Sequence, residues 1–360
     1  MNIKLHSNCI PIKGYYRSII IDLQRKTYYF IPNSMFEIIQ QFTKKRITEI
    51  KKLYTEEESK IIDEYINFLF SNDLCFYYND VNEDYFSPLS FDYKSPSKIT
   101  NAIISVKSNS IIVNKIVEQL DKLGCKAIQI QMLDNIDINE LENISHCFND
   151  SRIRDIQLLF PYNEYLEKEN LLKLLETNHR ITKLFVFGAP NSEIIFLDEY
   201  RKFPVYLTKQ KIENYSFCGN IHPQNFTCNM SFFIESQFYN TCLNRKVCID
   251  TNGNIKNCPN MQKTYGNIQD TTLTEAILKQ GFKDYWFIKK DDIDVCQDCE
   301  FRHICTDCRA FIKDPENIYS QPSKCSYNPY IAKWEGQEGW ISVEEWRKDN
   351  KYNQNRVVES

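Results

Sequence analysis

The cysteines of this chain are concentrated at one end, and this constrains its fold more than any other feature. Ten of the fourteen lie beyond residue 209, and four of them fall within the segment CQDCEFRHICTDC, residues 296–308. Two Cys-x2-Cys pairs in so short a segment are typical of metal ligands, because each tight loop turns both thiolates and nearby amide groups toward one site. The sequence therefore predicts a cysteine-ligated centre in its last third.

The compartment decides which cross-link such cysteines form. The first residues contain no apolar run of signal-peptide length, and no later stretch approaches the ~18 apolar residues of a membrane span. We therefore expect a cytoplasmic protein with no membrane partner. Clustered cysteines in a reducing compartment are more often ligands than disulfides. The net charge of −4 gives no general attraction to nucleic acid.

Eight of the cysteines form one continuous pattern, and three kinds of cross-link fit it. They could hold two four-cysteine iron–sulfur clusters, two structural zinc ions or four disulfides. The compartment disfavours disulfides, whereas ligand chemistry does not separate iron from zinc. Within the pattern, Asn252-Gly253 predicts the turn of a hairpin that brings its flanking cysteines together. The eight are Cys242, Cys248, Cys258, Cys296, Cys299, Cys305, Cys308 and Cys325.

The front of the chain predicts a small winged helix-turn-helix outline. Two strands rich in Ile, Tyr and Phe turn at residues 24–26, and three helices and a returning strand follow. Asn33 is expected to cap the first helix, while Thr55 and Glu58 form a capping box for the third. This third helix is acidic, which opposes phosphate contact and makes DNA binding the weaker interpretation.

Strands and helices alternate from Ile99 to about residue 208. Repeated strand-helix units predict an α/β fold with a parallel sheet, either open or partly closed as a (β/α) barrel. The polar, aperiodic stretch before it predicts a linker. The expected domains are residues 1–80, a linker at 81–98, a partial barrel at 99–215, a cysteine-rich domain at 216–335 and a tail at 336–360.

The cysteine pattern resembles the SPASM domain, the auxiliary-cluster module at the C-terminus of many radical SAM peptide-modifying enzymes. Cys242-x10-Gly253-x4-Cys258 fits its first half and the later cysteines fit its second. The family usually has three residues where this chain has only Thr306-Asp307. The resemblance implies two [4Fe-4S] clusters. Cys242, Cys248, Cys258 and Cys308 would hold one cluster, and Cys296, Cys299, Cys305 and Cys325 the other.

The middle region resembles a radical SAM barrel that lacks its reductive centre. That family holds a further cluster through Cys-x3-Cys-x2-Cys in the loop after the first barrel strand. Here the loop is KSNS, residues 107–110, and it contains no cysteine. We therefore expect that the chain does not cleave SAM.

The N-terminal outline resembles the PqqD-like element that binds leader peptides in ribosomal peptide biosynthesis. Such a module adds the leader as a strand to a sheet edge, while apolar side chains of the leader enter a groove beside the third helix. The alternative is that the same residues are ordinary core. By this analogy the expected contacts are Thr27, Tyr29, Ile31, Ile61, Tyr65 and Phe68.

Taken together, the three parts resemble the SPASM protein of grasp-with-spasm systems, which mature graspetide-type ribosomal peptides (RiPPs). The resemblance implies a precursor leader peptide and an ATP-grasp ligase as partners. Whether the chain is itself an enzyme does not follow from its residues. The alternatives are a redox enzyme that modifies the peptide through its clusters and a zinc-stabilised scaffold; clusters with every iron ligated weaken the redox alternative. Cys218 and Cys228 could supply redox chemistry or replace a ligand, although isolated cysteines are more commonly buried free thiols.

Overall fold

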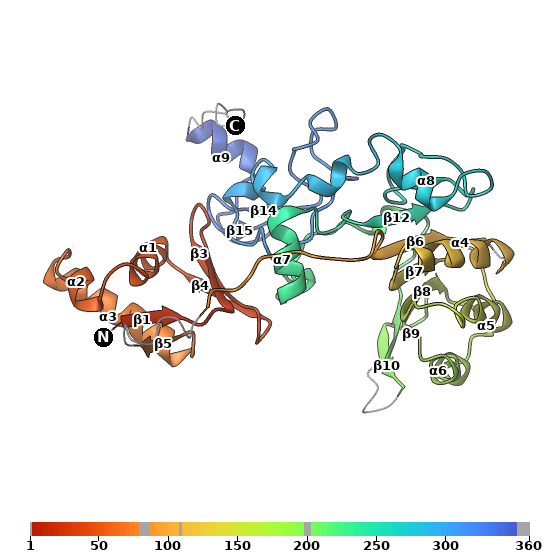
Figure 1. The fold of residues 1–360 in the computed structure, drawn as a ribbon, viewed down its shortest axis with the longest axis horizontal. Coiled ribbons are helices and arrows are strands. Elements are labelled where there is room, and N and C mark those ends of the chain that lie inside the picture. Colours follow the sequence, from red (N-terminus) through yellow and green to blue (C-terminus); the bar gives the residue numbers. More distant parts are fainter. Residues whose placement is uncertain (1, 79–86, 108–109, 198–202, 351–360) are drawn as a thin grey trace. The chain divides into compact units, whose positions relative to one another are not determined.

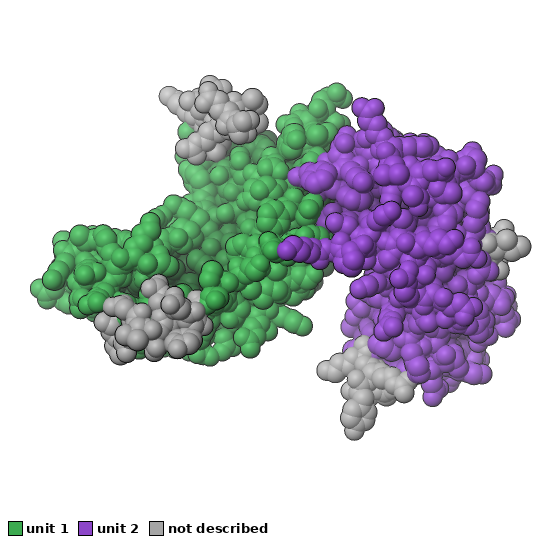
Figure 2. Space-filling view, in the orientation of Figure 1, with its two compact units in different colours: residues 1–93, 220–241, 288–360 green, residues 94–219, 242–287 purple. Residues whose placement is uncertain are grey.

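The computed structural model describes residues 2–78, 87–107, 110–197 and 203–350. The chain forms two compact units (Figure 2). Unit 1 contains residues 1–93, 220–241 and 288–360, and unit 2 contains residues 94–219 and 242–287. The predicted cysteine-rich domain, residues 216–335, therefore contributes to both units. No helix among the described residues is long and apolar enough to cross a bilayer.

Unit 2 is built on an eight-stranded sheet in the order β10-β11-β9-β8-β7-β6-β12-β13 (Figure 1). Neighbouring strands from β11 to β12 are parallel, and only the edge strands β10 and β13 run antiparallel to their neighbours. The expected α/β class and its parallel sheet are confirmed. The strands are β6 (Asn101–Ser105), β7 (Ala127–Gln131), β8 (Asp155–Pro161), β9 (Ile181–Phe187), β10 (Glu193–Phe196), β11 (Pro204–Thr208), β12 (Lys246–Ile249) and β13 (Ile255–Lys256).

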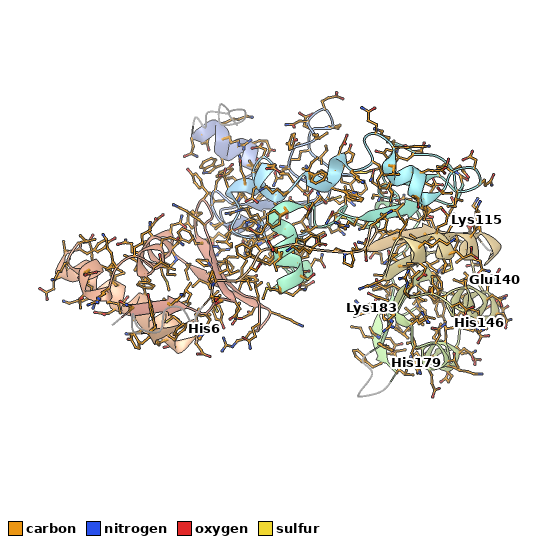
Figure 3. All side chains as sticks on the ribbon, viewed as in Figure 1. His6, Lys115, Glu140, His146, His179 and Lys183 are labelled. Carbon is orange, nitrogen blue, oxygen red and sulfur yellow. The ribbon has the colours of Figure 1, made fainter. Side chains whose placement is uncertain are left out.

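Three helices cover one face of this sheet. They are α4 (Ser110–Lys122), α5 (Ile138–His146) and α6 (Lys168–Thr177), and their apolar residues join one core with strand residues such as Ile104, Ile128 and Leu184. Alternate strand residues point to the opposite face, where Gln157 of β8 lies beside Lys183 of β9 (Figure 3). Cys248 is paired with Ile103 and therefore points to the same face as Gln157 and Lys183, opposite the face that α4, α5 and α6 cover.

Unit 1 combines the N-terminal strands and helices with most of the later cysteine segment. Its three-stranded antiparallel sheet has the order β2-β3-β4, and a separate pair joins β1 to β5. The predicted strands on either side of residues 24–26 and the three helices are confirmed, whereas β1 and β2 are additional. The elements are β1 (Asn2–Leu5), β2 (Cys9–Ile12), β3 (Ser18–Asp22), β4 (Thr27–Ile31), α1 (Asn33–Phe42), α2 (Ile47–Lys51), α3 (Glu56–Ser71) and β5 (Cys75–Tyr78).

The middle strand β3 is buried along both faces, and this explains how unit 1 is assembled. Ile20 packs with α1 and α3, while Ile19 and Ile21 pack on the other face against Phe301 and its neighbours in the cysteine segment. A sheet with two apolar faces must cover both of them. The N-terminal strands therefore share one core with residues nearly 300 positions later in the sequence.

Helix capping was predicted correctly at one position and wrongly at another. Thr55 and Glu58 form the expected capping box at the start of α3. Asn33 is not the N-cap of α1: Pro32 occupies that position and Asn33 is the first helical residue. Its side chain instead accepts a hydrogen bond from Ser18 Oγ at 2.6 Å and donates to the carbonyl of Tyr15, so it fastens the sheet rather than the helix.

The remaining elements are short. Part of the predicted tail packs against unit 1, because Trp346 of α9 stacks on Tyr330 with 4.2 Å between ring centroids. The predicted linker lies partly outside the described residues. The remaining elements are η2 (Tyr215–Phe217), η3 (Pro223–Asn225), α7 (Met230–Phe238), α8 (Leu273–Leu278), η4 (Asp284–Phe287), η5 (Lys290–Asp292), η6 (Cys296–Asp298), β14 (Tyr327–Asn328), β15 (Lys333–Trp334) and α9 (Val343–Asp349).

Candidate metal centres

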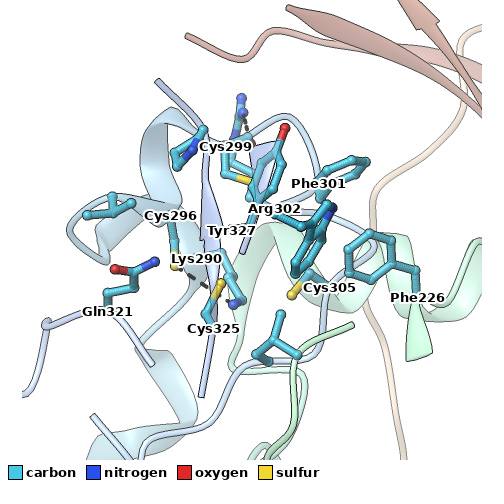
Figure 4. Close-up of a pocket in the computed structure, with 14 residues that line it drawn as sticks. Phe226, Lys290, Cys296, Cys299, Phe301, Arg302, Cys305, Gln321, Cys325 and Tyr327 are labelled. Carbon is cyan, nitrogen blue, oxygen red and sulfur yellow. Dashed lines mark hydrogen bonds between the residues drawn. The ribbon is translucent and has the colours of Figure 1, made fainter. Parts of the chain in front are cut away.

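Four of the predicted ligands line a single cavity in unit 1 (Figure 4). Cys296 begins η6, Cys299 ends the same turn, Cys305 follows the next turn, and Cys325 precedes β14. The first Cys-x2-Cys pair, Cys305 of the second pair and the distant Cys325 are thus brought to one cavity, as the second predicted cluster requires. Cys296 and Cys305 are buried, whereas Cys299 and Cys325 are half-buried.

An unusual backbone conformation presents Cys296 to this cavity. Val295 has a φ of +66°, which a β-branched residue rarely adopts. Its side chain is buried in a small core with Tyr330 and Trp346, and this packing offsets the strain. The next residue, Cys296, accepts a hydrogen bond through its carbonyl from the N–H of Cys299 at 3.0 Å, which closes the Cys-x2-Cys loop.

Four aromatic side chains form part of the cavity wall. Phe226 and Phe301 lie with ring centroids 4.8 Å apart, and Tyr327 and Trp334 lie at the same separation. Because these rings exclude water, burial raises the pKa of Cys296 and of Cys305 to about 11 each. Thiols in such surroundings give up their protons when a metal binds, so metal binding here is coupled to proton release.

A buried lysine lies among the sulfurs. Lys290 has only 5% of its side chain exposed, and its Nζ lies 3.8 Å from Cys296 Sγ (Figure 4). The same Nζ lies 3.6 Å from Asp307 Oδ1. Burial alone lowers the pKa of Lys290, but the neighbouring thiolates of Cys296 and Cys305 and the Asp307 carboxylate outweigh it and raise the pKa. The group is therefore an ammonium ion that offsets the negative charge of the thiolates.

Asp307 is itself held by a buried network. Arg309 Nη2 donates to Asp307 Oδ1 at 2.9 Å, and Asn240 Nδ2 donates to Oδ2 at 2.6 Å. The backbone N–H of Asp307 donates to Thr241 Oγ1 at 3.3 Å. Asp307 is one of the two residues in the shortened spacing before Cys308. Both its side chain and its backbone N–H are hydrogen-bonded, so this short spacer is held in one conformation.

Three ligands of the first predicted cluster lie in unit 2. The expected hairpin forms between β12 and β13, with Gly253 in its turn at a φ of +80°. Cys248 is paired with Lys256 across the hairpin, and Cys258 lies two residues after the end of β13. Cys242 precedes β12, and Lys246 Nζ lies 3.5 Å from its Sγ. The fourth predicted ligand, Cys308, is buried in unit 1.

The first set has electrostatics like those of the second. Burial raises the pKa of Cys258 to about 12. Removal of the Lys246 ammonium from water lowers its pKa, but the thiolates of Cys242 and Cys258 outweigh this and raise it.

No three His, Cys, Asp or Glu side chains in the described parts of the chain are placed to bind one metal ion. A polynuclear cluster spreads its thiolates over several irons, whereas one zinc ion holds its ligands about 3.8 Å apart by tetrahedral geometry.

The lysines were missed by sequence reasoning. Lysine is almost always exposed, so no composition rule places Lys290 or Lys246 inside a site. The available signal was their position, because each lies within a few residues of a predicted ligand.

His303 lies between two ligands in sequence but contacts α7, with Nδ1 3.2 Å from Ser236 Oγ, and burial lowers its pKa to about 4.

The predicted leader contacts lie on β4 and α3 of unit 1. Within the described residues β4 pairs only with β3, so its other edge carries no strand. Tyr29 of β4 contacts Phe68 of α3, with 6.3 Å between ring centroids, and Tyr65 of α3 lies beside them on the same core. Ile31 is buried, whereas Ile61 is 44% exposed. Thr27 is half-buried at the start of the strand.

Comparison with known proteins adds no family to these observations. No protein-family model matches the chain, and no curated protein matches it.

Proposed function

We propose that this protein is the leader-binding component of a grasp-with-spasm system, which matures a ribosomally synthesised peptide, and that it carries two [4Fe-4S] clusters. The observation that carries the proposal is the convergence of four cysteines, drawn from 30 residues of sequence, on one aromatic-walled cavity that also contains a buried lysine. Without a metal, burial keeps the thiols of Cys296 and Cys305 protonated, with pKa values of about 11, and a bound metal would replace those protons. A metal centre gives this arrangement a physical reason.

The donor set fits iron–sulfur clusters. Cys296, Cys299, Cys305 and Cys325 would hold the second cluster, and Cys242, Cys248 and Cys258, with Cys308 by the family pattern, would hold the first. Bound there, such clusters supply one-electron storage and a rigid cross-link between the segments that hold them.

The chain's own residues prepare both sites. The ammonium groups of Lys290 and Lys246 lie beside Cys296 and Cys242 and offset part of the thiolate charge. Hydrogen bonds and charges around the sulfurs set the potential of such a site. The aromatic wall around Phe301 keeps water from the second site, which favours a buried, stable centre over an exposed catalytic one.

Leader capture is proposed at the edge of β4. A leader strand would pair with the uncovered backbone of β4 and place apolar side chains beside Tyr29, Phe68 and the exposed Ile61 of α3. An ATP-grasp ligase would then act on the core peptide, because the sequence contains no phosphate-binding loop of its own. The open sheet of unit 2 is consistent with a partial radical SAM barrel. The KSNS loop lies partly outside the described residues.

The test is a metal analysis of the full chain purified without oxygen. We expect about eight irons and eight sulfides per chain, with the broad visible absorption of [4Fe-4S] clusters. A colourless protein that contains no iron would overturn the proposal, and two zinc ions per chain would establish the scaffold instead. Titration of a labelled precursor leader then tests the β4 edge, and an absence of binding would remove the leader-capture role.

A further inference from the structure

A fourth cysteine of unit 2 lies beside the first predicted cluster site. Cys218 follows η2, and its Sγ accepts a hydrogen bond from Asn260 Nδ2 at 3.2 Å. The backbone N–H of the same Asn260 hydrogen-bonds to the Sγ of Cys258. One residue therefore bridges the sulfur atoms of Cys218 and Cys258, although the two cysteines are 40 positions apart in the sequence.

The turn that carries Cys218 is fixed toward this site. Asn214 Oδ1 accepts from the N–H of Ser216 at 2.9 Å and caps η2. Asn260 Nδ2 also donates to the carbonyl of Tyr215 at 2.8 Å, so the same side chain holds both the turn and the sulfur. Gly219 follows Cys218 with a φ of +85°, a conformation that suits glycine and turns the chain sharply after the cysteine.

Electrostatic interactions also connect Cys218 with the three predicted ligands of the first cluster. Lys246 Nζ lies 3.5 Å from Cys242 Sγ, and the negative charges of Cys258 and Cys218 also act on this ammonium group. Cys258 is influenced in turn by Cys242 and Cys218. Cys248, on the neighbouring strand β12, is influenced most strongly among charged groups by Cys258. Amide donors and a cation around several sulfurs are the surroundings that cysteine-ligated clusters use.

We propose that Cys218 is a ligand of the first cluster, so that unit 2 supplies all four thiolates, Cys218, Cys242, Cys248 and Cys258, from its own residues. This inference rests on the proposed function, and it replaces Cys308, which the family resemblance implies. The shortened spacing before Cys308 gives a reason for the replacement. The intervening Asp307 is fixed by Arg309 and Asn240 within unit 1, where it also lies beside Lys290 of the second site.

The ligand can be identified by comparing Cys218→Ala with Cys308→Ala in the full chain reconstituted without oxygen. We expect Cys218→Ala to lose up to about four of the eight irons, or to show a changed electron paramagnetic resonance spectrum of the first cluster. Cys308→Ala should retain about eight irons and the wild-type spectrum. The matched control is Cys147→Ser, since the Cys147 thiol donates to the carbonyl of Asn143 and a hydroxyl can do the same.

A second measurement does not depend on whether a variant folds. In the wild-type protein loaded with iron, alkylation followed by mass spectrometry should show Cys218 protected, and chelation of the iron should expose it, while labelling of Cys147 should not change. Two results would overturn the Cys218 assignment and leave the two-cluster proposal intact. One is a loss of iron in Cys308→Ala with none in Cys218→Ala. The other is equal labelling of Cys218 in the iron-loaded and the chelated protein. A wild-type protein without iron would instead overturn the proposed function.

Discussion

Replacing Arg17 with methionine should destabilise unit 1 by an amount that the structure allows us to estimate. Arg17 precedes β3, and its Nε donates to Glu300 Oε1 at 2.8 Å. The Glu300 side chain has no exposed surface, whereas that of Arg17 is 28% exposed. Tyr327 OH donates to the same Oε1 at 2.5 Å, and Oε2 of Glu300 accepts no hydrogen bond from any residue in the described ranges. Compensation of the negative charge on this buried carboxylate therefore depends on Arg17.

Removing one partner of a fully buried ion pair costs about 3–5 kcal/mol, because the other charge is left uncompensated. Water reaches the partly exposed guanidinium, and the stranded carboxyl can take up a proton, so we expect a smaller loss of about 2–3 kcal/mol for Arg17→Met. Methionine keeps an apolar stem beside Phe30, over whose ring the guanidinium lies at 3.7 Å. The double variant Arg17→Met/Glu300→Gln should recover part of the loss, with a coupling of about 1–3 kcal/mol.

Urea unfolding without oxygen, followed by tryptophan fluorescence, measures this loss. Three of the four tryptophans, Trp334, Trp340 and Trp346, lie in unit 1, so the signal reports mainly on that unit. The control is Arg152→Met in unit 2, since Arg152 is 70% exposed and pairs with Asp121 at the surface. It should cost under about 1 kcal/mol. A similarly small loss for Arg17→Met, or strict additivity in the double variant, would refute the reasoning.

Three further predictions concern charge, pH and binding. Lys290→Met should lower the reduction potential of the second cluster, because the site loses a positive charge; an unchanged potential in a redox titration would contradict this. Asp22 accepts four hydrogen bonds from within residues 8–25, which outweigh its burial and lower its pKa. Asp22→Asn should therefore cost about 1–3 kcal/mol at pH 7. The cost should shrink progressively as the pH falls below ~4, because the unfolded state takes up a proton there before the folded carboxylate does, and it should vanish only below the lowered pKa of the folded protein; equal losses in urea unfolding at pH 7 and pH 3 would exclude this account. Ile61→Ser should weaken leader binding about tenfold by fluorescence anisotropy, whereas the control Leu53→Ser, at a residue that is also exposed, should leave it unchanged.

Local structure was predictable from the sequence because local rules determine it. The turn at Asn252-Gly253, the capping box at Thr55 and the strand-helix alternation after Ile99 each depend on neighbouring residues, and each is confirmed. The spacing of the cysteines predicted a cysteine-ligated centre in this segment, and the family resemblance, rather than the spacing, selected Cys296, Cys299, Cys305 and Cys325, which line one cavity. Asn33 failed as a cap because a tertiary partner, Ser18, binds its side chain instead.

The assembly of the two units was not predictable in the same way. The run Ile19-Ile20-Ile21 indicates a strand that is buried on both faces, but an apolar pattern does not say which segment covers each face. One covering residue is Phe301. It lies in sequence between Cys299 and Cys305, so the sequence indicated only that it belongs to a ligand loop, and not that it packs on β3. Lys290 and Lys246 were missed for the same reason, since their position beside the sulfurs depends on tertiary surroundings that no local pattern records.

The shared sheet has a consequence for how leader binding and the second metal site relate within unit 1. Phe30 of the edge strand β4 is 46% exposed, and its ring centroid lies 5.9 Å from that of Phe301, which lines the cysteine cavity. Arg17 lies over Phe30 and binds Glu300, next to Cys299. If the proposed leader strand pairs with β4 and shifts Phe30 or Arg17, it would also change the wall of the cavity. By thermodynamic linkage, a metal centre bound in that cavity would then change leader affinity by the same factor as the leader changes metal affinity.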